Sequence, residues 1–107
     1  MSTTTATESG TWQVVDGKLY ETPKSLFDQG YWVAKSNNVA YNENEVDRFV
    51  IGLIDEGAWF IGIWTDGGKT YVDDTVLVGD LIDAIQLARK YDQKAIWDIA
   101  HNTEIWV

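Results

Sequence analysis

The sequence of 107 residues has no cysteine, one proline, one methionine and one histidine. Without cysteine the chain forms no disulfide or thiolate zinc site, and it offers no thiol nucleophile. No apolar run approaches the roughly 20 residues that cross a bilayer, so we expect no membrane span. The first ten residues show neither the basic nor the apolar region of a secretory signal. These absences favour a cytoplasmic location.

Basic residues are also scarce, because 8 Lys and Arg stand against 17 Asp and Glu and leave a net charge of −9. Only Arg89 and Lys90 are adjacent, and the C-terminal end of a helix explains that pair. Binding a phosphate backbone requires clustered cations that displace counterions, so we expect no direct contact with nucleic acid. The negative charge allows a protein partner with a basic surface. It is also explained by solubility alone, without any partner.

Aromatic residues are abundant, with six Trp, five Tyr and three Phe in this short chain. We expect most of the tryptophans to pack in the core and one or two to reach the surface, where Trp is enriched at binding hot spots. The candidate binding residues are four tryptophans and two acids near them: Trp12, Trp32, Trp97, Trp106, Asp73 and Asp98.

Hydrophobic periodicity predicts an α+β fold with an antiparallel or mixed sheet of five or six strands and two principal helices. A single domain over residues 11–107 would follow a disordered polar tail of residues 1–10. A short helical turn is expected near Phe27. The strand signals cover residues 12–21 as a hairpin, then 31–35, 59–65, 69–73, 95–99 and 104–107.

The two helices have recognisable starts. Asn42 can cap the first helix, with Glu45 completing a capping box, and Gly57 can end it. Asp80 can cap the second helix, which would continue to Tyr91.

The strand predicted at residues 59–65 has apolar residues on both faces. A strand with two apolar faces is typical of a central position that is covered on both sides. We therefore expect Trp59 and Trp64 to be mainly scaffold.

The Gly67-Gly-Lys-Thr segment has part of a phosphate-loop motif, and its context argues against that function. The motif requires a glycine five residues before Gly68, and Ile63 stands there. The residues after Lys69 are β-formers, so no helix N-terminus follows to hold a phosphate. We expect a hairpin turn.

Metal and nucleophile signals are equally weak. The acids of the predicted hairpin include Asp73 and Asp74, which point to opposite faces of a regular strand and so share a cation poorly. His101 could act as a base only if folding brought Ser25 or Ser36 to it. We expect no metal, no cofactor and no catalytic residue, and we place His101 in an exposed turn.

Several segments together resemble a family of small proteins without an assigned activity. These segments are Gly30-Tyr-Trp-Val-Ala, the predicted helix from Asn42 to Ile54, Trp64-Thr-Asp-Gly-Gly-Lys-Thr-Tyr-Val-Asp, the spaced Asp80 and Asp83, Gln93-Lys-Ala-Ile-Trp-Asp-Ile, and Glu104-Ile. The family occurs in actinobacteria, their phages and their mobile elements, and the resemblance covers about residues 30–105. It implies an accessory protein of a phage or mobile element and brings no catalytic residues with it.

The leading functional hypothesis is a non-enzymatic protein that binds and modulates a host protein, as an inhibitor of a host process or defence system. One alternative is a virion component such as a decoration subunit. Another is a sponge that holds a small molecule in a Trp-lined pocket. The sequence leaves the oligomeric state open, a homodimer included.

Overall fold

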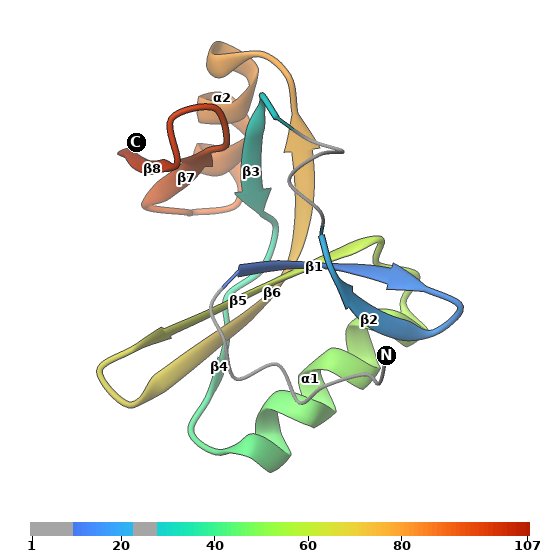
Figure 1. Cartoon of the computed structure of the whole chain (residues 1–107). Helices are drawn as coiled ribbons and strands as arrows, with labels where there is room; N and C mark the ends of the chain where they lie inside the picture. Colours follow the sequence, from blue (N-terminus) through green and yellow to red (C-terminus); the bar gives the residue numbers. More distant parts are fainter. Residues whose placement is uncertain (1–9, 23–27) are drawn as a thin grey trace.

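The computed structural model describes residues 10–22 and 28–107. Eight strands and two helices lie in these ranges (Figure 1). They are β1 (Gly10–Val15), β2 (Lys18–Glu21), β3 (Tyr31–Ala34), β4 (Asn38–Ala40), α1 (Glu43–Asp55), β5 (Phe60–Asp66), β6 (Lys69–Val78), α2 (Leu81–Lys90), β7 (Ala95–Asp98) and β8 (Thr103–Trp106). The helical turn predicted near Phe27 and all of the predicted tail except Gly10 lie outside the described residues.

The strands form one antiparallel sheet in the order β2-β1-β5-β6-β3-β7-β8, with β4 paired to β6 beside this path. The predicted α+β class with two helices is confirmed. The sheet has more strands than the five or six predicted. One that was missed is β4, whose three residues carry too little periodicity to reveal a strand.

Strand β6 joins two halves of the sheet. Its residues 69–74 pair with β5, and its residues 75–78 pair with β3. β4 pairs with residues 70–72 along the edge opposite β5. In Figure 1, β1 and β5 lie across the view, whereas β3 and the upper part of β6 lie vertically, so the sheet bends along β6.

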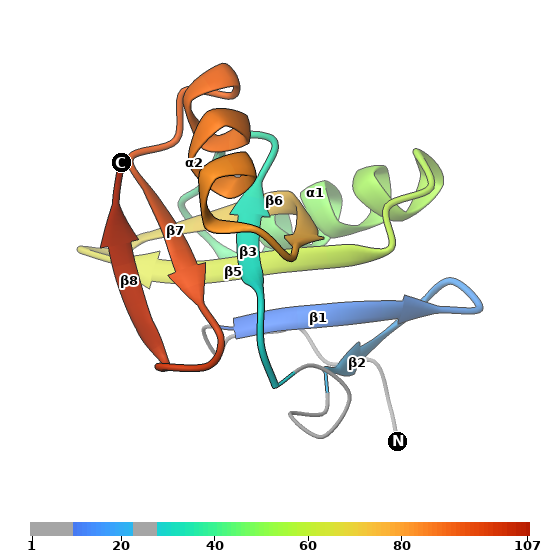
Figure 2. The same cartoon turned by 90° about the horizontal axis from the view of Figure 1, so that it is seen from above.

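Each half of the sheet has its own core beneath one helix. Buried residues of the first core come from β1, β2, β4, α1, β5 and β6, and those of the second come from β3, α2 and β7. Val72 belongs to the first core, and Val76 packs against the second. Because these residues are four apart in one strand, both cores lie on the same side of the sheet. Figure 2 shows both helices on the same side of β5.

Local signals for the helices are confirmed. The Asn42 side chain accepts the Glu45 backbone N–H at 2.9 Å, and the Glu45 carboxylate accepts the Tyr41 N–H at 3.0 Å. Asp80 accepts the Asp83 N–H at 3.0 Å at the start of α2. These bonds satisfy amide groups that a helix N-terminus otherwise leaves without partners.

Gly62 lies at a close approach between the two halves of the sheet. It lies in β5 opposite Asp73. A Cβ atom at this position would lie 2.7 Å from Oγ1 of Thr75, which is itself buried. The glycine is therefore required for space, because a methyl group would collide with a β-branched neighbour that has few alternative rotamers.

We predict that Gly62→Ala lowers the free energy of unfolding by about 1–3 kcal/mol through overpacking. Adding Thr75→Ala should reduce this loss, because the colliding hydroxyl is then absent. Gly52→Ala is the matched control: a Cβ there meets nothing within 4 Å, and Ala should stabilise α1 by up to about 1 kcal/mol. Urea denaturation of the four proteins measures these changes. Equal stability of Gly62→Ala and the wild type would contradict the close approach.

Candidate functional site

The side of the sheet away from the helices carries a series of aromatic side chains. Ile61 and Ile63 of β5 are buried in the first core. Successive residues of a strand point to opposite faces, so Phe60 and Trp64 face away from α1.

The second half of the sheet continues this aromatic surface. Val33 and Ile96 are buried beneath α2, so their neighbours Trp32 and Trp97 point to the helix-free side. Trp32 and Trp97 are directly opposite each other in the β3–β7 pairing.

Strand β8 adds a last tryptophan. Ile105 packs against the second core, so Trp106 and Glu104 lie on the helix-free side. We call the tryptophans and the phenylalanine of this side the aromatic face: Trp32, Phe60, Trp64, Trp97 and Trp106.

Two contacts within the aromatic face cross the bend of the sheet. The ring centroids of Trp32 and Phe60 are 4.9 Å apart, with an angle of 54° between the ring planes. Those of Trp64 and Trp97 are 5.4 Å apart, at 44°. Each pair joins a residue of β5 to a residue of the second half. Such tilted aromatic contacts stabilise by about 0.5–1.5 kcal/mol beyond their buried area.

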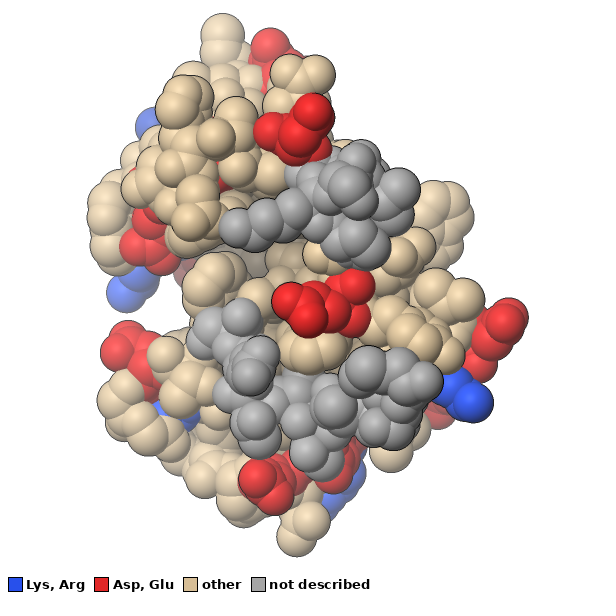
Figure 3. Space-filling view, viewed as in Figure 1, with Lys and Arg blue, Asp and Glu red and all other residues tan. Residues whose placement is uncertain are grey.

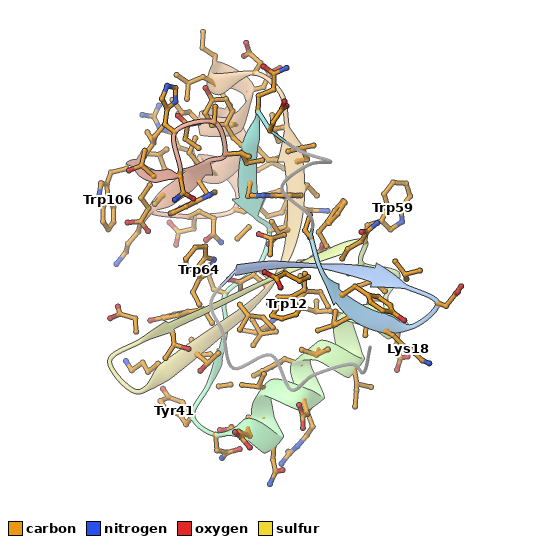
Figure 4. All side chains as sticks on the ribbon, viewed as in Figure 1. Trp12, Lys18, Tyr41, Trp59, Trp64 and Trp106 are labelled. Atoms are coloured by element: carbon orange, nitrogen blue, oxygen red, sulfur yellow. The ribbon has the colours of Figure 1, made fainter. Side chains whose placement is uncertain are left out.

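Part of the aromatic face is open to solvent. Trp106 is 71% exposed and Trp64 is 39% exposed. Figure 4 shows both on the same side of the molecule, whereas Trp59 lies at the far end. A surface on which several aromatic side chains gather is a candidate contact site, whereas a single exposed tryptophan such as Trp59 is not.

The structure separates the candidate tryptophans. Trp32, Trp97 and Trp106 come together on the aromatic face, but Trp12 is only 7% exposed and belongs to the first core. Figure 4 shows it between β1 and α1. Its partner across β1–β5 is Ile61, whose side chain faces α1, so Trp12 has no access to a partner.

Trp59 and Trp64 also differ from the prediction. Trp59, the residue before β5, is 78% exposed. Trp64 does support the bend through Trp97, as a scaffold residue would, yet it remains partly exposed. Phe60, Gly62 and Trp64 alternate along β5 with the residues of the core face. This alternation is the feature of the sequence that predicted a second apolar face.

Asp73 is buried at the bend. The residue is 5% exposed, and its carboxylate accepts the Asn38 backbone N–H at 3.1 Å. Burial raises the pKa of Asp73 from 3.8 to about 7, although hydrogen bonds from Asn38 and Ser36 favour the charged form. Asp73 therefore holds the β3–β4 connection against β6 and offers no carboxylate to a partner.

Polar contacts around Ser36 hold the same connection. The Ser36 hydroxyl accepts the Asp74 N–H at 3.1 Å, and the Ser36 carbonyl accepts the Gln93 side-chain amide at 3.0 Å. Burial also raises the pKa of Asp74; Lys35 opposes this shift. The connection is thus tied to β6 and to the segment before β7.

Asp98 and His101 form a local pair in the β7–β8 turn. The buried Asp98 carboxylate lies 2.8 Å from Nδ1 of His101 and accepts the His101 backbone N–H at 3.3 Å. The His101 ring is exposed, as predicted. Ser36 has the partners described above, and Ser25 lies outside the described residues. The Asp98–His101 contacts therefore fix the turn, and Asp98 is not available to a partner.

Within residues 10–22 and 28–107, no three His, Asp or Glu side chains gather to hold a metal ion. Neither helix of these ranges is long and apolar enough to cross a membrane. The surface in Figure 3 shows acidic groups spread across the visible face and fewer basic groups, mainly near its margin.

Comparisons with known proteins identified no relative of this chain. No protein-family model, no curated protein and no solved structure matches the chain.

The raised pKa of Asp73 predicts a pH-dependent stability. Between pH 4 and pH 7 the folded protein retains a proton that the unfolded chain has released, so the free energy of unfolding falls as pH rises. A rise in pKa from 3.8 to about 7 corresponds to a loss of at most about 4 kcal/mol. Asp73→Asn has no carboxyl group to titrate at this position. The stability of this variant relative to the wild type should therefore increase between pH 4 and pH 7.

Denaturation at several pH values tests this expectation. Asp66→Asn, at the exposed β5–β6 turn, is the control because it removes the same charge from a site open to water. A pH dependence in Asp73→Asn equal to that of the wild type would contradict the assignment.

Proposed function

We propose that this chain is a non-enzymatic accessory protein of a phage or mobile element that binds and modulates a host protein. The observation that carries the proposal is the aromatic face, with Trp64 and Trp106 exposed on one side of a chain of net charge −9. Contact would occur in the host cytoplasm, and the chain would inhibit a host process or defence system by occupying the partner's surface.

The chemistry of this surface supports a protein partner with basic groups. Trp106 offers a large apolar area and an indole N–H, a combination that is enriched at protein interfaces. Long-range attraction would come from the charge of −9, which speeds encounter with a cationic surface. The same charge repels phosphate backbones, so nucleic acid is a poor partner.

The biological setting rests on the resemblance of residues 30–105 to proteins of actinobacteria, their phages and mobile elements. That resemblance supports the use of an actinobacterial host as the source of the partner. It also keeps the virion subunit and the small-molecule sponge as alternatives. Abundance of the chain in purified particles would favour the former, and a metabolite retained in native mass spectrometry would favour the latter.

We predict that Trp106→Ala weakens capture of the host partner by about tenfold or more, because central tryptophans carry a large share of interface energy. Trp64→Ala should weaken it as well. Trp59→Ala is the matched control, since Trp59 is at least as exposed as Trp106 and Trp64 but lies at the far end of the molecule. Immobilised wild-type and variant chains are incubated with actinobacterial lysate, and retained proteins are quantified by mass spectrometry.

Thermal denaturation of each variant confirms that all of them fold. If no protein depends on Trp106 and Trp64 more than on Trp59, the aromatic face is not the binding surface and the proposal fails.

A further inference from the structure

We propose that the outer edge of β8 accepts an extended segment of the partner in which cationic and apolar side chains alternate. The segment would add a strand to the sheet beside Thr103–Trp106. The site rests on the proposed function, because its occupant belongs to the partner protein inferred above.

The backbone of β8 presents two sets of groups at this edge. Val107 donates its N–H to the Lys94 carbonyl at 2.9 Å, so these opposite residues form a hydrogen-bonded position of the β7–β8 ladder. Inward and outward positions alternate along an antiparallel pair. The N–H and C=O groups of Glu104 and Trp106 therefore point away from β7.

The edge is also open. Among the described residues, β8 ends the strand order and pairs only with β7. Figures 1 and 2 both show β8 at the outside of the sheet. Sheets commonly protect such edges with lysine, proline or a bulge. The sequence Thr-Glu-Ile-Trp has neither lysine nor proline, whereas β2, at the opposite end of the sheet, begins with Lys18.

Side chains on the two faces of β8 define the occupant. On the helix side Ile105 belongs to the margin of the second core, so the partner residue opposite it would be apolar. On the aromatic face, Glu104 and Trp106 stand two residues apart. A cation opposite Glu104 gains an ion pair, and one opposite Trp106 can lie over the indole ring. Alternation of cationic and apolar residues follows from this arrangement.

Charge distinguishes this occupant from a second copy of the chain. Pairing β8 with itself would bring together two molecules that each carry −9. A cationic strand would instead be attracted to the negatively charged chain.

The test uses the full chain and an acetylated, amidated peptide in which arginine and valine alternate. We expect NMR titration to shift the amide signals of Glu104 and Trp106 first and to slow their hydrogen exchange. Glu104→Lys should weaken binding by about tenfold or more. Glu21→Lys, in the exposed end of β2, is the matched control because it changes net charge equally, and its effect should stay within about twofold.

Two altered peptides separate strand addition from general attraction. Methylation of alternate backbone nitrogens of the peptide should abolish binding, because an added strand needs its N–H groups. Replacing each arginine of the peptide by glutamate should also abolish binding, because the peptide would then be repelled by Glu104. Equal losses in Glu104→Lys and Glu21→Lys, shifts confined to other elements, or self-association through β8 without peptide would overturn the proposal.

The two proposals fail separately. If Trp106 and Trp64 are required for partner capture but the peptide does not bind the β8 edge, strand addition is wrong and the proposed function stands. If the peptide binds at β8 but no host protein depends on the aromatic face, the edge is a strand-addition site and the proposed function is wrong.

Discussion

The continuity of β6 is the constraint on which the other parts of this structure depend. One strand of ten residues belongs to both halves of the sheet, pairing first with β5 and then with β3. Each half has a small core of its own beneath one helix. Because neither core covers the helix-free side, contacts across the bend must hold the halves at a fixed angle. Gly62 makes the close approach there, and the pairs Trp32–Phe60 and Trp64–Trp97 close it.

The buried polar groups at the bend lower the stability of the fold and fix the path of the chain there. A carboxylate as buried as Asp73 loses hydration, and the Asn38 N–H and the Ser36 hydroxyl replace only part of it. An apolar residue would avoid the loss but would leave the Asn38 N–H without this acceptor. Asp73 thus exchanges stability for a fixed path of the β3–β4 connection, a role that buried polar groups have in other folds as well.

Much of the fold could be predicted because its signals are local. Asn42 and Asp80 cap their helices through residues three positions later, and the Asp16–Gly17 turn adopts positive φ at both residues, as the hairpin requires. The bend could not be predicted, since it depends on pairs such as Ser36 with Gln93, 57 residues apart. Strand alternation placed Trp64 on an apolar face correctly, but it could not show that only part of this face is covered.

The burial of a residue depends on contacts that are distant in the sequence, and this explains why only part of the candidate site could be predicted. Composition alone cannot distinguish the buried Trp12 from the exposed Trp106, because both are tryptophans in short β-strands. Their difference arises from position: β1 lies between two strands, and α1 covers one of its faces, whereas β8 ends the sheet. Trp106 therefore retains both an uncovered ring and an uncovered backbone edge. A partner that used both would gain apolar area and directional hydrogen bonds at one place, so the proposed contact at β8 would be more specific than one at an isolated surface tryptophan such as Trp59.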